Sequence, residues 1–86
     1  QLRGPDHLET VVARWIHGIA MFSRERRTEG LAEMRRAASD YERLFDPDDR
    51  LVGMYENLLQ AEAQTGNVDA ASAWLHKLLD TADASI

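Results

Sequence analysis

Two segments of the chain match without a gap when one is shifted by 34 residues. Residues 37–46 and 71–80 share the pattern Ala-x3-(Tyr/Leu)-x2-Leu-(Phe/Leu)-Asp. A small residue followed by large apolar residues four and seven positions later is the pattern of a helix that packs closely on another helix. A repeat of about 34 residues is typical of paired-helix units, which stack into protein-binding surfaces.

The composition is that of a small folded domain. With 86 residues the chain has room for one domain, and its 44% hydrophobic and 29% charged residues are ordinary for a globular protein. It has no cysteine, which excludes disulfides and thiolate metal sites and favours a reducing compartment. No apolar run approaches the roughly 18 residues that span a bilayer, and no signal-peptide pattern opens the chain. We therefore expect a cytoplasmic protein with no membrane partner.

The start of the chain suggests a piece of a longer protein. It begins with Gln1, and residues 1–5 have the character of a linker that leads into a helix. We expect a helical domain over 6–86, with one hairpin at about 6–45 and a second at about 46–84. Neighbouring repeats or domains of the intact protein would then cover the exposed surfaces of the hairpins.

The spacing of apolar residues predicts four helices joined by short polar turns. Asp6 and Glu9 have the spacing of a capping box, which predicts a first helix over about 7–26. Thr28 is the expected cap of a second helix, whose apolar face continues to Phe45. No window alternates with period two, so the predicted fold class is all-α.

The later helix boundaries carry stronger signals. Asp46 is expected to cap the third helix, with Pro47 at its first helical position. Gly66 is expected to end that helix in the left-handed conformation, and Asn67 to cap the fourth helix. Short turns favour antiparallel neighbours, so we predict two stacked helical hairpins. Four aromatic residues are expected in the core or at the repeat interface: Trp15, Tyr41, Tyr55 and Trp74.

The clearest family resemblance lies around the last predicted turn. Residues 66–71, followed by Leu75 and Leu78, resemble the G-x-x-x-x-A-x3-F-x2-A signature of the second helix of a tetratricopeptide repeat. The resemblance implies one repeat over about 52–85 and a second, less regular repeat before it.

The irregularity of the first repeat concerns its turn. Gly30 precedes Ala37 by seven residues, whereas Gly66 precedes Ala71 by five. The alignment with the tetratricopeptide pattern therefore implies about two extra residues in the first hairpin turn.

Two further segments narrow the resemblance. Residues 18–20 and 29–35 are similar to the C-terminal helical repeats of large bacterial signalling ATPases, among them LuxR-type regulators and adenylate-cyclase-linked proteins. This similarity implies a regulatory segment of a larger signalling or transcription-regulating protein.

The resemblance also implies a binding groove lined by the first helix of each repeat. It places six polar side chains on that groove: His17, Arg24 and Arg27 in the first repeat, and Glu56, Gln60 and Gln64 in the second. Such a strip suits the backbone or a carboxylate of a bound peptide. The alternative is that all six are solvated side chains that bind nothing.

Charge is unevenly distributed along the chain, whose net charge is −5. Residues 14–36 hold six arginines and three glutamates, and residues 37–86 hold ten acidic and three basic residues. Overall acidity argues against nucleic acid as a partner, and no aromatic residues interleave with the arginines for base stacking. An acidic protein segment is the partner that the arginine cluster favours, unless its arginines serve only as helix-end charges and local ion pairs.

Motifs that carry chemistry are lacking. The three histidines, His7, His17 and His76, form no H-E-x-x-H or E-x-x-H string. The carboxylates at 46, 48 and 49 lack the spacing and the glycine of a calcium loop. No nucleophile–base pairing or glycine-rich phosphate loop is legible, so we expect no catalytic residue, no cofactor and no metal.

The sequence thus favours a non-catalytic protein-interaction or regulatory module. Three alternatives remain open. One is self-association into a homodimer through an apolar end face near Trp74. A second is a small-molecule sensor whose pocket is lined by Met21, Met54 and aromatic side chains. The third, which the overall acidity disfavours, is nucleic-acid binding by the arginine cluster.

Overall fold

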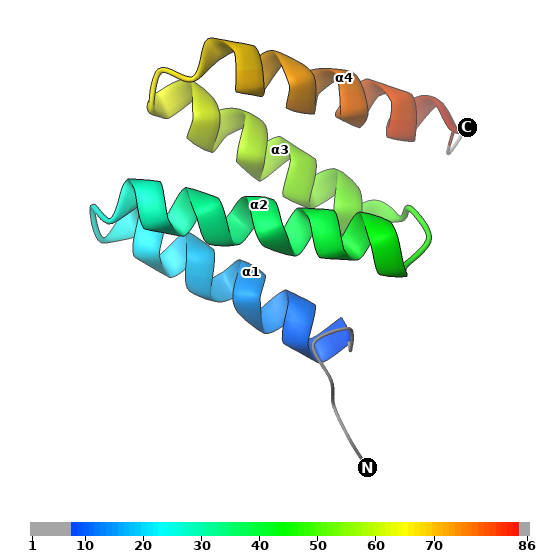
Figure 1. The fold of residues 1–86 in the computed structure, drawn as a ribbon. Coiled ribbons are helices and arrows are strands. Elements are labelled where there is room, and N and C mark those ends of the chain that lie inside the picture. The colour runs from blue at the N-terminus through cyan, green and yellow to red at the C-terminus, as the bar shows by residue number, and fades with distance from the viewer. Residues whose placement is uncertain (1–7, 85–86) are drawn as a thin grey trace. The chain divides into compact units, whose positions relative to one another are not determined.

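The computed structural model describes residues 8–84, and the regular structure in that range is entirely helical. Its four helices are α1 (Leu8–Ser23), α2 (Arg27–Leu44), α3 (Asp49–Gln64) and α4 (Val68–Ala84). Helix α1 packs on α2, and α3 packs on α4 (Figure 1). The all-α prediction is confirmed, and each pair is a helical hairpin. The chain divides into two compact units between Asp46 and Pro47, one hairpin in each. The predicted stacking of one hairpin on the other stays a prediction.

The buried residues of α2 and α3 repeat at helical spacing. In α2 they are Gly30, Leu31, Met34, Ala37, Ala38 and Tyr41, and in α3 they are Leu51, Met54, Tyr55, Leu58, Ala61 and Glu62. Both sets keep to one face of their helix, as intervals of three and four residues require. Trp15, Tyr41 and Tyr55 are buried as predicted, whereas Trp74 is only half-buried.

Two glycines set the contact between α1 and α2. A β-carbon on Gly30 would clash with the backbone nitrogen of Phe22 and lie 2.6 Å from the carbonyl oxygen of Gly18. A β-carbon on Gly18 would lie 2.9 Å from the carbonyl oxygen of Gly30. These neighbours are backbone atoms that no rotamer change can move. The two helices therefore touch backbone to backbone. This contact offsets the cost of a glycine inside a helix, which is about 1 kcal/mol relative to alanine.

Both hairpin turns have the same length and the same backbone geometry. Residues 24–26 join α1 to α2, and residues 65–67 join α3 to α4. The middle residue of each turn has positive φ, +70° at Glu25 and +84° at Gly66. The left-handed conformation expected of Gly66 is confirmed. The predicted two-residue insertion in the first turn is wrong, because Glu25 occupies the position of Gly66 and Gly30 lies inside α2.

The correspondence of the turns changes the alignment of the two hairpins. Gly30 and Ala71 each come five residues after the positive-φ residue, and both are buried. Ala37, the partner of Ala71 in the sequence pattern, lies seven residues beyond Gly30. Seven residues are two helical turns and return to the same face of the helix. The sequence pattern therefore identifies the correct face of α2. It matches Ala71 with Ala37, whereas the hairpin turns match Ala71 with Gly30, two helical turns earlier.

Three helix ends differ from the predictions. Helix α1 ends at Ser23 rather than near 26, and α2 begins at Arg27 without a side-chain cap from Thr28. Asp48, not Asp46, caps α3, because its extended backbone lets its carboxylate accept a hydrogen bond from the Leu51 amide at 3.2 Å. Pro47 consequently precedes the helix. The predicted capping box at Asp6 lies outside the described residues.

Substitution of Gly30 by alanine tests the backbone contact. Gly30→Ala is expected to lower the free energy of unfolding by about 1–3 kcal/mol, because its β-carbon overlaps fixed backbone atoms. Gly53→Ala is the control, since a β-carbon on that helical glycine meets nothing within 4 Å. It should be neutral or stabilise by up to about 1 kcal/mol. Urea titrations followed by circular dichroism measure both changes, and equal effects would contradict the contact.

Exchange of the residues at the two turn centres tests the shared turn geometry. Glu25→Gly is expected to raise the free energy of unfolding by about 0.5–1 kcal/mol, because glycine adopts positive φ without a steric penalty. Gly66→Ala should lower it by about 1–2 kcal/mol for the opposite reason. Thermal and urea unfolding of both variants measure these shifts. A loss of stability in Glu25→Gly would show that the two turns differ.

Candidate functional site

The predicted groove residues of the first hairpin lie on its surface. His17 is exposed on α1, Arg24 is exposed in the turn, and Arg27 is exposed at the first position of α2. The guanidinium carbon of Arg27 lies 5.5 Å from the centroid of the Phe22 ring, a cation–π contact that holds this side chain near the turn. Arg24 and Arg27 thus sit at one end of the hairpin, near its turn.

The predicted groove residues of the second hairpin form a row on α3. Glu56, Gln60 and Gln64 are all exposed and are spaced by four residues, so they lie on one side of the helix. Among the described residues Glu56, the one charged member of the row, has no ion pair. The row offers a carboxylate and two amides to solvent, and its role in binding stays a prediction.

One arginine of the basic cluster is held by a neighbouring carboxylate. Arg26 Nε donates to Glu29 Oε1 at 2.7 Å, and Arg26 Nη2 donates to Glu29 Oε2 at 3.0 Å. This bidentate pair raises the pKa of Arg26 and lowers the pKa of Glu29 below its ordinary value. Arg26 is therefore paired within its own hairpin.

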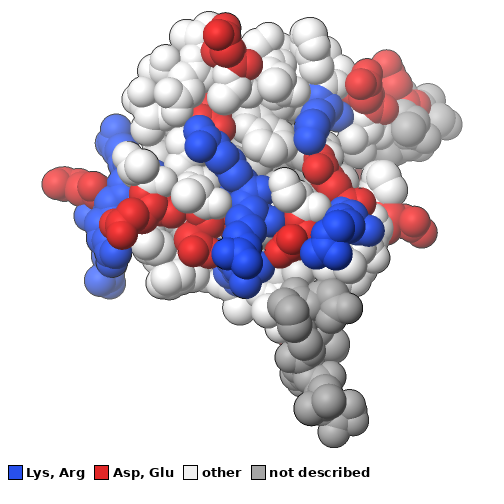
Figure 2. All heavy atoms as spheres, in the orientation of Figure 1, with Lys and Arg blue, Asp and Glu red and all other residues white. Residues whose placement is uncertain are grey.

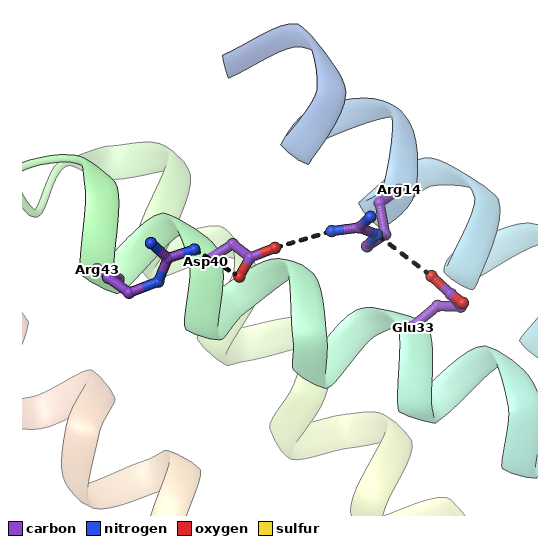
Figure 3. Close-up of polar contacts among 4 residues, drawn as sticks. All are labelled: Arg14, Glu33, Asp40 and Arg43. Carbon is purple, nitrogen blue, oxygen red and sulfur yellow. Dashed lines mark hydrogen bonds and ion pairs between the residues drawn. The ribbon is translucent and has the colours of Figure 1, made fainter. Parts of the chain in front are cut away.

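A second ion-pair network joins α1 to α2. Figure 3 shows Arg14 reaching from α1 to two carboxylates of α2. Its Nη1 donates to Asp40 Oδ2 at 2.8 Å, and its Nε lies 3.6 Å from Glu33 Oε1. Arg43 Nη2 donates to the other oxygen of Asp40 at 3.3 Å. The network is partly buried and ties Arg14 of α1 to residues two turns apart on α2. The sequence carries no local signal for this network, because Arg14 and Asp40 lie 26 positions apart.

The second hairpin contains a buried carboxylate. Glu62 on α3 is 0% exposed, although its side chain is ionisable. Its Oε1 accepts a hydrogen bond from Asn67 Nδ2 and its Oε2 accepts one from Trp74 Nε1, both at 3.0 Å. The Trp74 ring also lies 5.8 Å from the ring of Tyr55. Glu62 therefore connects α3 to the turn and to α4. The Trp74 side chain is held against α3 by this hydrogen bond and is not part of a freely exposed end face.

Asn67 has more than one role at the start of α4. As predicted for a cap, it immediately precedes the helix, and its carbonyl oxygen accepts a hydrogen bond from the Ala71 amide at 2.9 Å. Its side-chain amide donates to Glu62 and, at 3.2 Å, to Thr65 Oγ1. The side chain thus braces the turn against α3.

The surface of α4 carries an apolar stripe. Val68, Leu75 and Leu79 are 72%, 38% and 53% exposed. At 100° per residue these three side chains lie within a narrow arc, with exposed Ala82 beside them. We name these four residues the α4 face. In Figure 2 the upper part of the surface, where α4 lies, is mostly uncharged, whereas Lys and Arg alternate with Asp and Glu across α2.

One edge of the α4 face is acidic. Asp69, Asp80 and Asp83 are exposed and follow the face around the helix on the side away from its buried residue, Ala71. Within the described part of the chain, none of these three carboxylates has an ion pair.

The exposure of the α4 face differs from what the sequence pattern predicts. The pattern predicts Leu75 in a helix contact, but Leu75 is 38% exposed. The available signal was that α4 has more large apolar residues than its contact with α3 covers.

In residues 8–84 no group of three or more His, Cys, Asp or Glu side chains is placed to hold a metal ion. None of the described helices combines the length and the apolar character that crossing a membrane requires.

Comparison with family models, with curated proteins and with solved structures finds no match to this chain. The tetratricopeptide resemblance is therefore supported only at the level of paired helices in an all-α fold.

Replacement of the Glu62 carboxyl group by an amide tests the buried network. Glu62→Gln is expected to lower the free energy of unfolding by about 1–3 kcal/mol, because the new amide nitrogen faces a donor N–H. Glu56→Gln makes the same change on the exposed side of α3 and should stay within about 0.5 kcal/mol of the parent chain. Chemical denaturation measures both. Equal effects would show that the buried carboxylate contributes no more than a surface one.

Proposed function

We propose that this chain is a non-catalytic protein-interaction module, a tetratricopeptide-like regulatory segment of a larger cytoplasmic signalling protein. Its sequence has no catalytic or cofactor motif, as described above, and its two helical hairpins are the kind of unit that presents preformed surfaces. The mechanism would be passive. A protein segment docks on the rigid helical surface, and its occupancy is passed to the remainder of the protein.

The α4 face is the observation that carries this proposal. Isolated exposed apolar side chains are normal on a folded protein, but Val68, Leu75 and Leu79 share one stripe of one helix. Such a stripe matches the anchors that an amphipathic helix presents at intervals of three, four and seven residues. Docking of such a helix would remove three large aliphatic side chains from water. The α4 face therefore fits a helical protein segment better than a nucleotide or a polar metabolite.

The exposed polar residues have a secondary place in the proposal. Arg24 and Arg27 near one turn suit a carboxylate of a partner, and the row of Glu56, Gln60 and Gln64 suits its backbone groups. Each set is taken on its own hairpin, and polar contacts of this kind contribute less affinity than a buried apolar centre.

A displayed library of 20-residue amphipathic helices tests the proposal. We expect enriched helices to bind with an affinity that falls at least about tenfold, or about 1.4 kcal/mol, when Leu79 is changed to Glu. Asn57→Glu adds the same charge at an exposed position of α3 and should leave the affinity unchanged. Fluorescence anisotropy with the enriched peptides measures both. Failure to enrich any helix, or equal binding to the Leu79→Glu variant, would contradict this function.

A further inference from the structure

Helix α4 has apolar residues on two adjacent sides. Its inner side, which packs on α3, carries buried Ala71 and half-buried Trp74 and Leu78. Its outer side is the α4 face, in which Leu75 and Leu79 are 38% and 53% exposed. Leu75 directly follows Trp74 in the sequence, and in the same way Leu79 follows an inner leucine. The two sides therefore differ by a shift of one residue, which is a rotation of about 100° around the helix axis.

A shift of one residue would preserve the character of the inner side. It would bring exposed Ser72 to the place of buried Ala71 and exposed Ala82 to the place of half-buried Thr81. Serine and alanine are both small, so the two helices could approach as closely as they do now. Leucines would fill the two large inner positions. Because the burial of apolar area has no direction, it discriminates weakly between two such sides of one helix.

Directional contacts distinguish the two arrangements. The Glu62 side chain on α3 is buried, and its Oε2 accepts a hydrogen bond from Trp74 Nε1 at 3.0 Å. A shift would place Leu75, which has no donor, where Trp74 now lies, and would carry the indole N–H away from α3. Glu62 would then lose a hydrogen bond in its buried position, which costs more than the same loss at the surface.

The same carboxyl group also holds the start of α4. Its Oε1 accepts a hydrogen bond from Asn67 Nδ2, and Asn67 immediately precedes the helix. The preceding residue, Gly66, has positive φ and lies in an exposed turn, where one residue can be added to the turn at low cost. The turn alone therefore does not fix the side that α4 presents to α3. The two hydrogen bonds to Glu62 act together on the turn and on the inner side of the helix.

We propose that Glu62 is a positioning residue that selects which side of α4 packs on α3 and thereby keeps the α4 face exposed. A buried polar group fixes the register of paired helices in coiled coils, where apolar packing alone leaves more than one arrangement open. The consequence for partner binding rests on the function proposed above. The side that α4 presents can be measured without any partner.

Cysteine labelling of the whole chain measures which side of α4 faces α3. The chain has no cysteine, so one introduced thiol gives an unambiguous signal. Ser72→Cys places the thiol at an exposed position that the shift would bury. Ala70→Cys places it at a half-buried position that the shift would expose. A buried thiol reacts only when the helix opens locally, so the reaction rate reports burial.

Glu62→Leu is the decisive change, because leucine fills the same space and accepts no hydrogen bond. In this variant we expect the thiol at position 72 to react at least about fivefold more slowly and the thiol at position 70 at least about fivefold faster. Opposite changes indicate a rotation of α4, whereas a loosened helix would raise both rates. Faster reaction at both positions, or unchanged rates, overturns the proposal.

Glu62→Gln is the matched control. Its side-chain amide keeps an acceptor oxygen for Trp74, so both rates should stay within about twofold of the parent chain even where the variant is less stable. A reversal of the two rates in Glu62→Gln as large as in Glu62→Leu would show that the acceptor is not the cause, and it overturns the positioning role.

Trp74→Phe replaces Glu62→Leu if circular dichroism shows that the latter is unfolded. Phenylalanine keeps an aromatic ring beside Tyr55 and removes only the N–H that Glu62 accepts. We expect the same pair of opposite rate changes, at least about twofold each, because the hydrogen bond to Asn67 remains. Unchanged rates in this variant overturn the proposal.

Binding of the displayed helices separates this inference from the proposed function. Glu62→Leu should lower the affinity of enriched helices at least about tenfold, and Glu62→Gln should keep it. If the thiol rates reverse but no helix binds the parent chain, the positioning role stands and the proposed function fails. If helices bind the parent chain and the rates do not reverse, the function stands and the positioning role of Glu62 is refuted.

Discussion

The backbone contact between Gly18 and Gly30 sets the geometry of the first hairpin. No side chain separates α1 from α2 at this point, so the distance between the helices is fixed by peptide atoms. That closeness places Arg14 within hydrogen-bonding distance of Asp40. The same hairpin has a tight three-residue turn in which Glu25 adopts a positive φ. A favourable helix contact thus accommodates a less favourable turn residue.

The second hairpin reaches a similar shape by other means. Its turn has glycine at the positive-φ position, and a small residue, Ala71, is buried where the first hairpin has Gly30. A buried carboxylate adds directional contacts, because Glu62 accepts hydrogen bonds from both Asn67 and Trp74. These bonds orient α4 through its turn and its inner edge. They leave the outer stripe of α4 uncovered, and the proposed function rests on this stripe.

The sequence predicted the fold better than it predicted the surface. Apolar spacing, the glycine at 66 and the asparagine at 67 were local signals, and the helices follow them. The predicted insertion before Ala37 is wrong, because Gly30 lies inside α2 and the turn residue with positive φ is Glu25. Asp48, and not the predicted Asp46, caps α3. Three carboxylates lie close together in the sequence here, and only the backbone conformation decides which one reaches the Leu51 amide. The ion pairs of Arg14 span too many residues to leave a pattern.

The sequence by itself determined that this chain forms four amphipathic helices with short turns, because helical periodicity and turn residues act over a few positions. It also excluded disulfides, since there is no cysteine. Only the tertiary structure decided which apolar residues are covered and which, like Leu79, remain exposed. It likewise decided that Glu62 is buried and that Gly18 meets Gly30. Burial depends on which helix packs against which side, and that choice is made by contacts between residues far apart in the chain.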